Sequence, residues 1–88
     1  MEEVLKKLKE QLELQEWPNV YFFKFVIPNQ PEQIAQATAL FNETAEISFH
    51  NSTNGNYTSI SVKEVMVNSD EIIEIYKKAA TIKGIISL

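Results

Sequence analysis

The stretch that decides the fold is residues 45–67, which read AEISFHNSTNGNYTSISVKEVMV. Asn54-Gly55 stands between two segments in which apolar and polar residues alternate, and this pattern is typical of a β-hairpin. Both residues accept the positive φ angles of a type I′ turn, so we expect a two-residue loop with Thr53 opposite Asn56. That loop would fix the register of the whole hairpin, because the numbers of paired residues then add up to the same value along both strands.

The predicted register gives the hairpin two different faces. One face is apolar and is expected to join the core, with Ile47 opposite Val62 and Phe49 opposite Ile60. The other face is rich in hydroxyl groups, and its expected pairs are Glu46 with Lys63, Ser48 with Ser61, His50 with Ser59, and Ser52 with Tyr57. Beyond Lys63 the alternation breaks. Either a bulge restores the phase there, or the strand end turns Val65 and Val67 outward.

The residues before the hairpin predict a helix, a strand and a second helix. Residues 2–14 carry an apolar stripe at helical spacing, and Trp17-Pro18 closes that segment. The stripe consists of Val4, Leu5, Leu8 and Leu12. Residues 20–27 are aromatic and β-branched, as in a central strand, with one strongly apolar face formed by Tyr21, Phe23, Phe25 and Ile27. The second helix is expected from Pro31, with Asn29 or Gln30 as its cap, to about residues 42–44. Its buried stripe would be Ile34, Ala37, Leu40 and Phe41.

The residues after the hairpin predict a helix and a short strand. Ser69-Asp70-Glu71 is expected to cap the helix, whose apolar residues recur at helical spacing. These residues are Ile72, Ile75, Tyr76 and Ala79. The final strand is expected over Ile82–Leu88.

After the leading helix, the predicted order is βαββαβ, which defines a ferredoxin-like α+β sandwich. We expect an antiparallel sheet of order 4-1-3-2 with two helices on one face, in a single domain made of a 1–16 extension and a 17–88 core. The opposite sheet face would then be open. Its candidate binding or interface residues, together with those of the hairpin turn, are Phe22, Lys24, His50, Ser52, Asn56, Tyr57, Ser59 and Ser61.

The composition excludes several kinds of chemistry. The chain has 88 residues, a formal charge of −4, no Cys, no Arg, one His and one Asp. Without thiolates and with one imidazole, we expect no metal site, no cofactor and no catalytic residues. An acidic chain without Arg repels the phosphate backbone, so we expect no binding to nucleic acid. No apolar run is long enough to span a membrane, so a cytoplasmic, non-enzymatic protein is expected.

The hairpin also resembles a known family. Residues Ser52 to Ser61 are similar to the Ser-x-x-Gly-Asn-Tyr-x-Ser-Val-Ser hairpin of the YbeD-like family, small domains of unknown function. Trp17-Pro18 before an aromatic strand and the 82–88 ending fit the same family. The resemblance covers about residues 14–88, and it implies an ACT-like fold and a regulatory role often labelled lipoate-associated. The chain departs from the family pattern in its longer N-terminal helix, in Glu64 and in Ala79-Ala80.

Two modes of action are expected from these features. In the first, the domain is a regulatory or adaptor module that binds a protein partner, or a second copy of itself, through the open sheet face. In the second, it senses a small-molecule effector held near the loop 28–31, as the resemblance to ACT-like domains implies. His50 and Ser59 lie opposite each other on a flat face, which provides no converging oxyanion site for a hydrolase.

Overall fold

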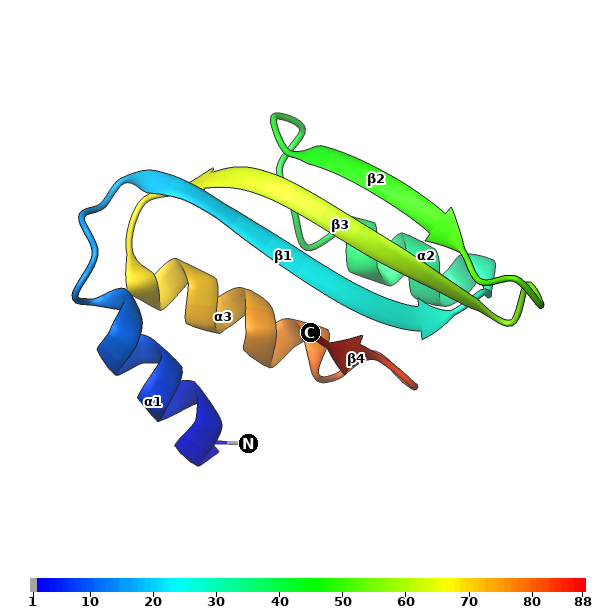
Figure 1. Cartoon of the computed structure of the whole chain (residues 1–88), viewed down its shortest axis with the longest axis horizontal. Coiled ribbons are helices and arrows are strands. Elements are labelled where there is room, and N and C mark those ends of the chain that lie inside the picture. The colour runs from blue at the N-terminus through cyan, green and yellow to red at the C-terminus, as the bar shows by residue number, and fades with distance from the viewer. Residues whose placement is uncertain (1) are drawn as a thin grey trace.

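A computed structural model describes residues 2–88 of the chain. Its elements are α1 (Glu2–Leu12), β1 (Asn19–Pro28), α2 (Pro31–Thr38), β2 (Glu46–Asn51), β3 (Tyr57–Met66), α3 (Ser69–Ala79) and β4 (Ile86–Ser87). The strands form one antiparallel sheet in the order β2-β3-β1-β4, and α2 and α3 lie on the same side of it (Figure 1). The predicted βαββαβ order, sheet order and additional N-terminal helix are confirmed, so the arrangement is ferredoxin-like.

The register of the hairpin is confirmed, but its turn is not the predicted one. Every β2–β3 pair is as expected, from Glu46 opposite Lys63 to Asn51 opposite Thr58. No residue other than glycine has a positive φ among residues 2–88, so Asn54 cannot be part of a type I′ turn. Instead, Gly55 N donates to Ser52 O at 2.9 Å and closes a four-residue turn, in which only Gly55 has a positive φ, of 75°.

Side chains of the turn take over the hydrogen bonds that a tight hairpin would make through its backbone. Asn54 Oδ1 accepts from Asn56 N at 3.1 Å and from Ser52 Oγ at 2.8 Å. Tyr57 N donates to Ser52 Oγ at 3.1 Å. Asn and Ser commonly stabilise turns in this way, and the wider loop therefore keeps the register of the two-residue loop.

Beyond Lys63 the strand continues without a bulge. Pairing between β1 and β3 is unbroken from Pro28 opposite Tyr57 to Asn19 opposite Met66. The alternation therefore puts Glu64 on the core face, where it is buried and accepts a hydrogen bond from Asn42 N at 3.1 Å. Val65 consequently points away from the core.

The core lies between the sheet and the helices. Phe23, Phe25 and Ile27 of β1 are almost completely buried, as predicted, and so are Ile60 and Val62 of β3. The rings of Phe23 and Phe25 pack against those of Phe41 and Tyr76 with centroid distances of 5.2 to 6.4 Å. The aromatic first strand is therefore the centre of the core.

The prediction that Phe49 belongs to the core is wrong. Its side chain is 51% exposed although it lies on the same sheet face as Ile60, its partner in β3. Strand β2 is at the edge of the sheet, whereas α2 packs against β1. The helix layer therefore does not cover the middle of β2, and Phe49 is left at its margin.

Three helix boundaries differ from the prediction. Helix α1 ends at Leu12, and α2 ends at Thr38 because its last turn tightens into i to i+3 bonds, from Leu40 N to Ala37 O and from Phe41 N to Thr38 O. This tighter turn lets Leu40 and Phe41 reach the core. Helix α3 is capped by Asn68, whose Oδ1 accepts from Glu71 N at 2.9 Å, and not by the 69–71 segment.

The last strand is shorter than the predicted Ile82–Leu88. Ile82 is buried in a turn after α3, and Gly84 has a φ of 81° close to the ring of Pro28. Pairing with β1 covers only Ile86 and Ser87, which lie opposite Val26 and Phe25. Leu88 N adds one hydrogen bond to Lys24 O at 2.9 Å.

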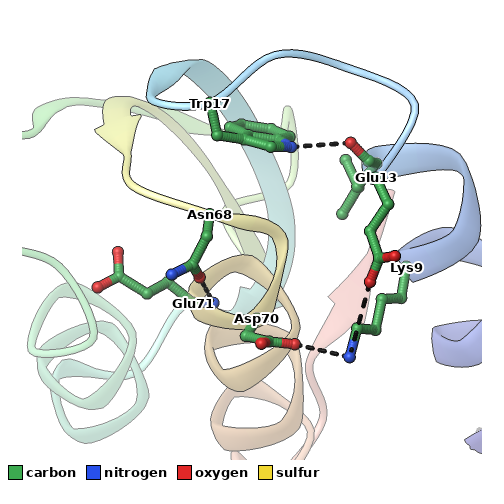
Figure 2. Close-up of polar contacts among 7 residues, drawn as sticks. Lys9, Glu13, Trp17, Asn68, Asp70 and Glu71 are labelled. Carbon is green, nitrogen blue, oxygen red and sulfur yellow. Dashed lines mark hydrogen bonds and ion pairs between the residues drawn. The ribbon is translucent and has the colours of Figure 1, made fainter.

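Helix α1 is attached to α3 and to its own following loop (Figure 2). Leu5 and Leu12 are buried in the common core. Lys9 Nζ lies 2.8 Å from Asp70 Oδ1, at the start of α3. The Trp17 indole N–H donates to Leu12 O at 2.8 Å, which satisfies a carbonyl at the end of the helix. The N-terminal helix is thus a packing element of this domain.

Candidate functional site

The sheet face that the helices leave uncovered is formed by alternate residues of β1, β2 and β3 (Figure 1). Pairing places Phe22 beside Lys63, Lys24 beside Ser61, and Val26 beside Ser59. On β2, Ser48 lies opposite Ser61 and His50 opposite Ser59. The predicted residues Phe22, Lys24, His50, Ser59 and Ser61 therefore share one face; we call it the open face.

A shallow depression lies in the open face. Its volume is about 630 Å³, and its lining includes Phe22, Lys24, Glu46, Ser48, Ser61 and Lys63. Three strands contribute side chains to it, because the cross-strand pairs bring β2, β3 and β1 side by side. The structure thus joins three of the predicted residues, Phe22, Lys24 and Ser61, in a single concave surface.

Apolar side chains extend this surface toward the start of β1. Phe22 is 68% exposed and Val65 is 63% exposed, and Val20 lies directly opposite Val65. Val20 and Val65 were not among the predicted site residues. The register between β1 and β3 brings Val20 and Val65 together. The sequence indicated this position of Val65 in one of the two alternatives for the strand end, the one without a bulge, in which Val65 points outward.

The charges on the open face differ in how they are paired. Lys63 Nζ lies 3.8 Å from Glu46 Oε2, and both side chains are exposed, so the pair contributes little to stability. Lys24 has no ion pair within residues 2–88. The depression therefore contains an exposed cation next to an exposed aromatic ring.

The single histidine has no catalytic arrangement around it. Ser59 Oγ donates to the backbone oxygen of His50 at 3.3 Å and not to the imidazole. In the described part of the chain, no group of three or more His, Cys, Asp or Glu residues could hold a metal ion. His50 and Ser59 also lie outside the lining of the depression.

The remaining predicted residues lie at the turn of the hairpin. Ser52 makes turn hydrogen bonds with its hydroxyl, and Asn56 makes one with its backbone N–H. Tyr57 lies opposite Pro28 and is 46% exposed. These residues lie at the end of β3 that is farthest from the apolar side chains Val20, Phe22 and Val65. The structure therefore does not bring them into the depression.

The loop between β1 and α2 is fastened to the hairpin. Asn29 N donates to Asn56 O, and Asn29 Nδ2 donates to Gly55 O, both at 2.9 Å. The buried Thr58 hydroxyl lies 3.0 Å from Asn29 Oδ1 and 2.9 Å from Asn51 Oδ1; with one hydrogen it donates to one of them at a time. The polar groups of Asn29 are therefore engaged within the protein.

Fold and site together define a small ferredoxin-like α+β domain with an open, partly apolar sheet face. The family model "Protein of unknown function (DUF493)", the YbeD family, matches residues 12–87, and the chain belongs to this family. Searches of curated proteins and of solved structures returned no match. Within residues 2–88 no helix has the length and apolar character needed to cross a membrane.

Proposed function

We propose that this protein is a non-enzymatic regulatory or adaptor module that binds a protein partner through its open face. The observation that supports this most strongly is the joined surface of Phe22, Val20 and Val65 beside the exposed Lys24, which has no ion pair within residues 2–88. Exposed apolar patches on small domains commonly mark interaction sites. Aromatic side chains at the centre of such patches often contribute most of the binding energy.

The chemistry of the surface suggests what the partner presents. An apolar side chain would fill the depression beside Phe22, and a carboxylate would pair with Lys24. The resemblance to the YbeD-like family adds a regulatory role linked to lipoate metabolism as the proposed context of this binding.

The alternative mode, a small-molecule effector at loop 28–31, has less support. Asn29 and Gln30 are the two polar side chains of that loop, and the side chain of Asn29 already bonds to Gly55 and Thr58. A ligand held by Asn29 would have to replace these bonds. We therefore favour the open face as the binding site.

Affinity capture from an extract of the producing cells, compared between variants, tests the proposal. We expect wild-type protein and Val4→Lys, which changes an exposed residue of α1, to retain the same protein, and Phe22→Lys to lose it. Direct titration of that protein should show an affinity at least about tenfold lower for Phe22→Lys, equal to about 1.4 kcal/mol. Equal binding by Phe22→Lys and wild type would rule out the open face.

A further inference from the structure

Glu64 is a buried carboxylate whose charge has little compensation within the protein. Its side chain is 6% exposed and lies on the core face of β3, the face that also carries Val62 and Met66. Oε1 accepts one hydrogen bond, from Asn42 N at 3.1 Å, and no ion pair within residues 2–88 includes Glu64. A buried charge is costly unless it is paired with a cation or accepts several hydrogen bonds.

The second carboxylate oxygen of Glu64 is open to a cavity. Oε2 has no hydrogen-bond partner among residues 2–88. In this part of the chain every fully buried side-chain oxygen or nitrogen has a partner, so Oε2 is not sealed inside the core. Glu64 lines a cavity of about 450 Å³ at the end of β3. A carboxylate that is more than nine-tenths buried therefore remains accessible to a ligand from one side.

Three segments of the chain form the walls of this cavity. They are the end of β3 with the turn that follows it, the first turns of α3, and the connection between α2 and β2. The apolar part of the lining consists of Leu40, Val65, Met66, Val67 and Ile75. The cavity can therefore hold an alkyl stem together with a charged end group.

The other charged groups at the cavity are mostly acidic. Besides Glu64, the charged residues of the lining are Asp70, Glu71, Glu74 and Lys78. Asp70 is paired with Lys9 at 2.8 Å, and the Glu71 side chain points away from that pair (Figure 2). Glu74 forms an exposed pair with Lys77 at 3.9 Å. Four carboxylates and one ammonium group thus line the cavity, so its charge is complementary to a cation.

We propose that this cavity binds the guanidinium group of an arginine side chain from a protein partner, with Glu64 as its main contact. A guanidinium is less strongly hydrated than an ammonium ion, so it enters a partly buried site at a lower cost of desolvation. Its N–H groups would donate to Oε2 of Glu64, and its alkyl stem would lie against Leu40 and Ile75. The 88 residues contain no arginine, so the group comes from a different protein and not from a second copy.

This site is separate from the open face. Successive residues of a strand point to opposite faces, so Glu64 lies on the other side of β3 from Lys63 and Val65. Phe22→Lys, the variant that tests the open face, should therefore leave guanidinium binding unchanged. Glu64→Gln should likewise leave the open-face partner bound. The two proposals can thus fail independently of each other.

Titration with blocked peptides, followed by amide chemical shifts, tests the choice of ligand. The probe is a tripeptide of alanine, arginine and alanine with both ends blocked. Its control contains citrulline, which has nearly the same shape as arginine but no charge. We expect saturable shift changes centred on Asn42, Glu64 and Glu71 with the arginine peptide, and an affinity at least tenfold lower for the citrulline peptide.

Glu64→Gln tests the role of the carboxylate. Its amide oxygen can still accept the hydrogen bond from Asn42 N, while the charge is lost. Binding of the arginine peptide should weaken at least tenfold, and the urea midpoint of unfolding should stay the same or rise, because an uncompensated buried charge has been removed. Glu10→Gln is the matched control: it removes the same charge from an exposed position of α1 and should change neither property.

Three results would overturn the proposal. The first is equal binding of the arginine and citrulline peptides, or equal binding of the arginine peptide by wild type and Glu64→Gln. The second is tighter binding of free arginine than of the peptide, which would indicate a small-molecule site. The third is a clear loss of stability in Glu64→Gln, which would show that the carboxylate serves the fold.

Discussion

At the scale of single residues, the two glycines show how a residue can be required for different reasons. Gly55 and Gly84 have similar positive φ angles, 75° and 81°. A Cβ atom on Gly55 would meet nothing within 4 Å, whereas one on Gly84 would lie 2.7 Å from Cγ of Pro28. Gly55 is therefore needed for its conformation alone, and Gly84 also for the close contact that brings β4 to β1.

These glycines give the first stability prediction. Gly55→Ala should lower the free energy of unfolding by about 1–2 kcal/mol, the cost of a left-handed residue. Gly84→Ala should lower it by more, because the same cost is combined with the clash against Pro28. Urea unfolding of both variants measures the difference. An equal or smaller loss for Gly84→Ala would mean that the chain near Pro28 moves aside easily.

The hydroxyls of Tyr21 and Tyr76 form a hydrogen-bonded pair, 3.0 Å apart, at the margin of the core. Burial raises the pKa of the Tyr76 phenol well above its ordinary value of 10.0, and the hydrogen bond with Tyr21 raises it further. Above pH 10 the unfolded chain releases this proton while the folded chain keeps it. The folded protein then binds more protons, so its stability must fall as the pH rises.

The second prediction follows from this titration. The free energy of unfolding should decrease between pH 9 and pH 11, and Tyr76→Phe should make the decrease smaller. Asp70 also raises the pKa of Lys9, so part of the decrease should remain in this variant. Urea unfolding at several pH values measures the slope. Identical slopes for wild type and Tyr76→Phe would show that the phenol is not protected by folding.

At the scale of elements, α1 tests where the domain begins. The family model starts at residue 12, yet Leu5, which precedes it, is buried in the same core as β1 and α3. Leu5→Ala should therefore lower the free energy of unfolding by about 2–5 kcal/mol, as for other buried leucines. Val4→Ala, at a 69% exposed position of the same helix, should change it by less than about 0.5 kcal/mol.

Thermal or urea unfolding of these two variants tests whether α1 is part of the folded domain. Equal, small effects would mean that α1 is not anchored on the rest of the domain. A second, separate unfolding step for α1 would lead to the same conclusion.

The elements also show what the sequence predicts well. Asn54-Gly55 predicted the correct hairpin register, because a short turn and two alternating strands leave few other pairings. The turn itself was mispredicted, since the side chains of Ser52 and Asn54 replace backbone bonds. The exposure of Phe49 could not be read from its alternation, because it depends on how far the helix layer reaches across the sheet.

At the scale of the whole molecule, the chain has no Cys, no Arg and a single His, and the proposed function relies on the open face of the sheet. The order of elements places α2 and α3 on one side of the sheet and leaves the other side uncovered (Figure 1). Of the predicted site, Phe22, Lys24 and Ser61 meet in the depression. Ser52, Asn56 and Tyr57 lie at the hairpin turn and not in the depression. The sequence prediction grouped all of these residues into one site, but their positions along the strands keep the two sets apart.

The most direct test of the proposed function is to map the bound partner on the domain by amide chemical shifts. We predict the largest shift changes at Phe22, Lys24, Ser61 and Lys63, with little change along α1 and at the hairpin turn. The Phe22→Lys variant should show none of these changes while keeping its own dispersed spectrum. Shift changes centred on the helices or on the turn would contradict the open face as the binding site.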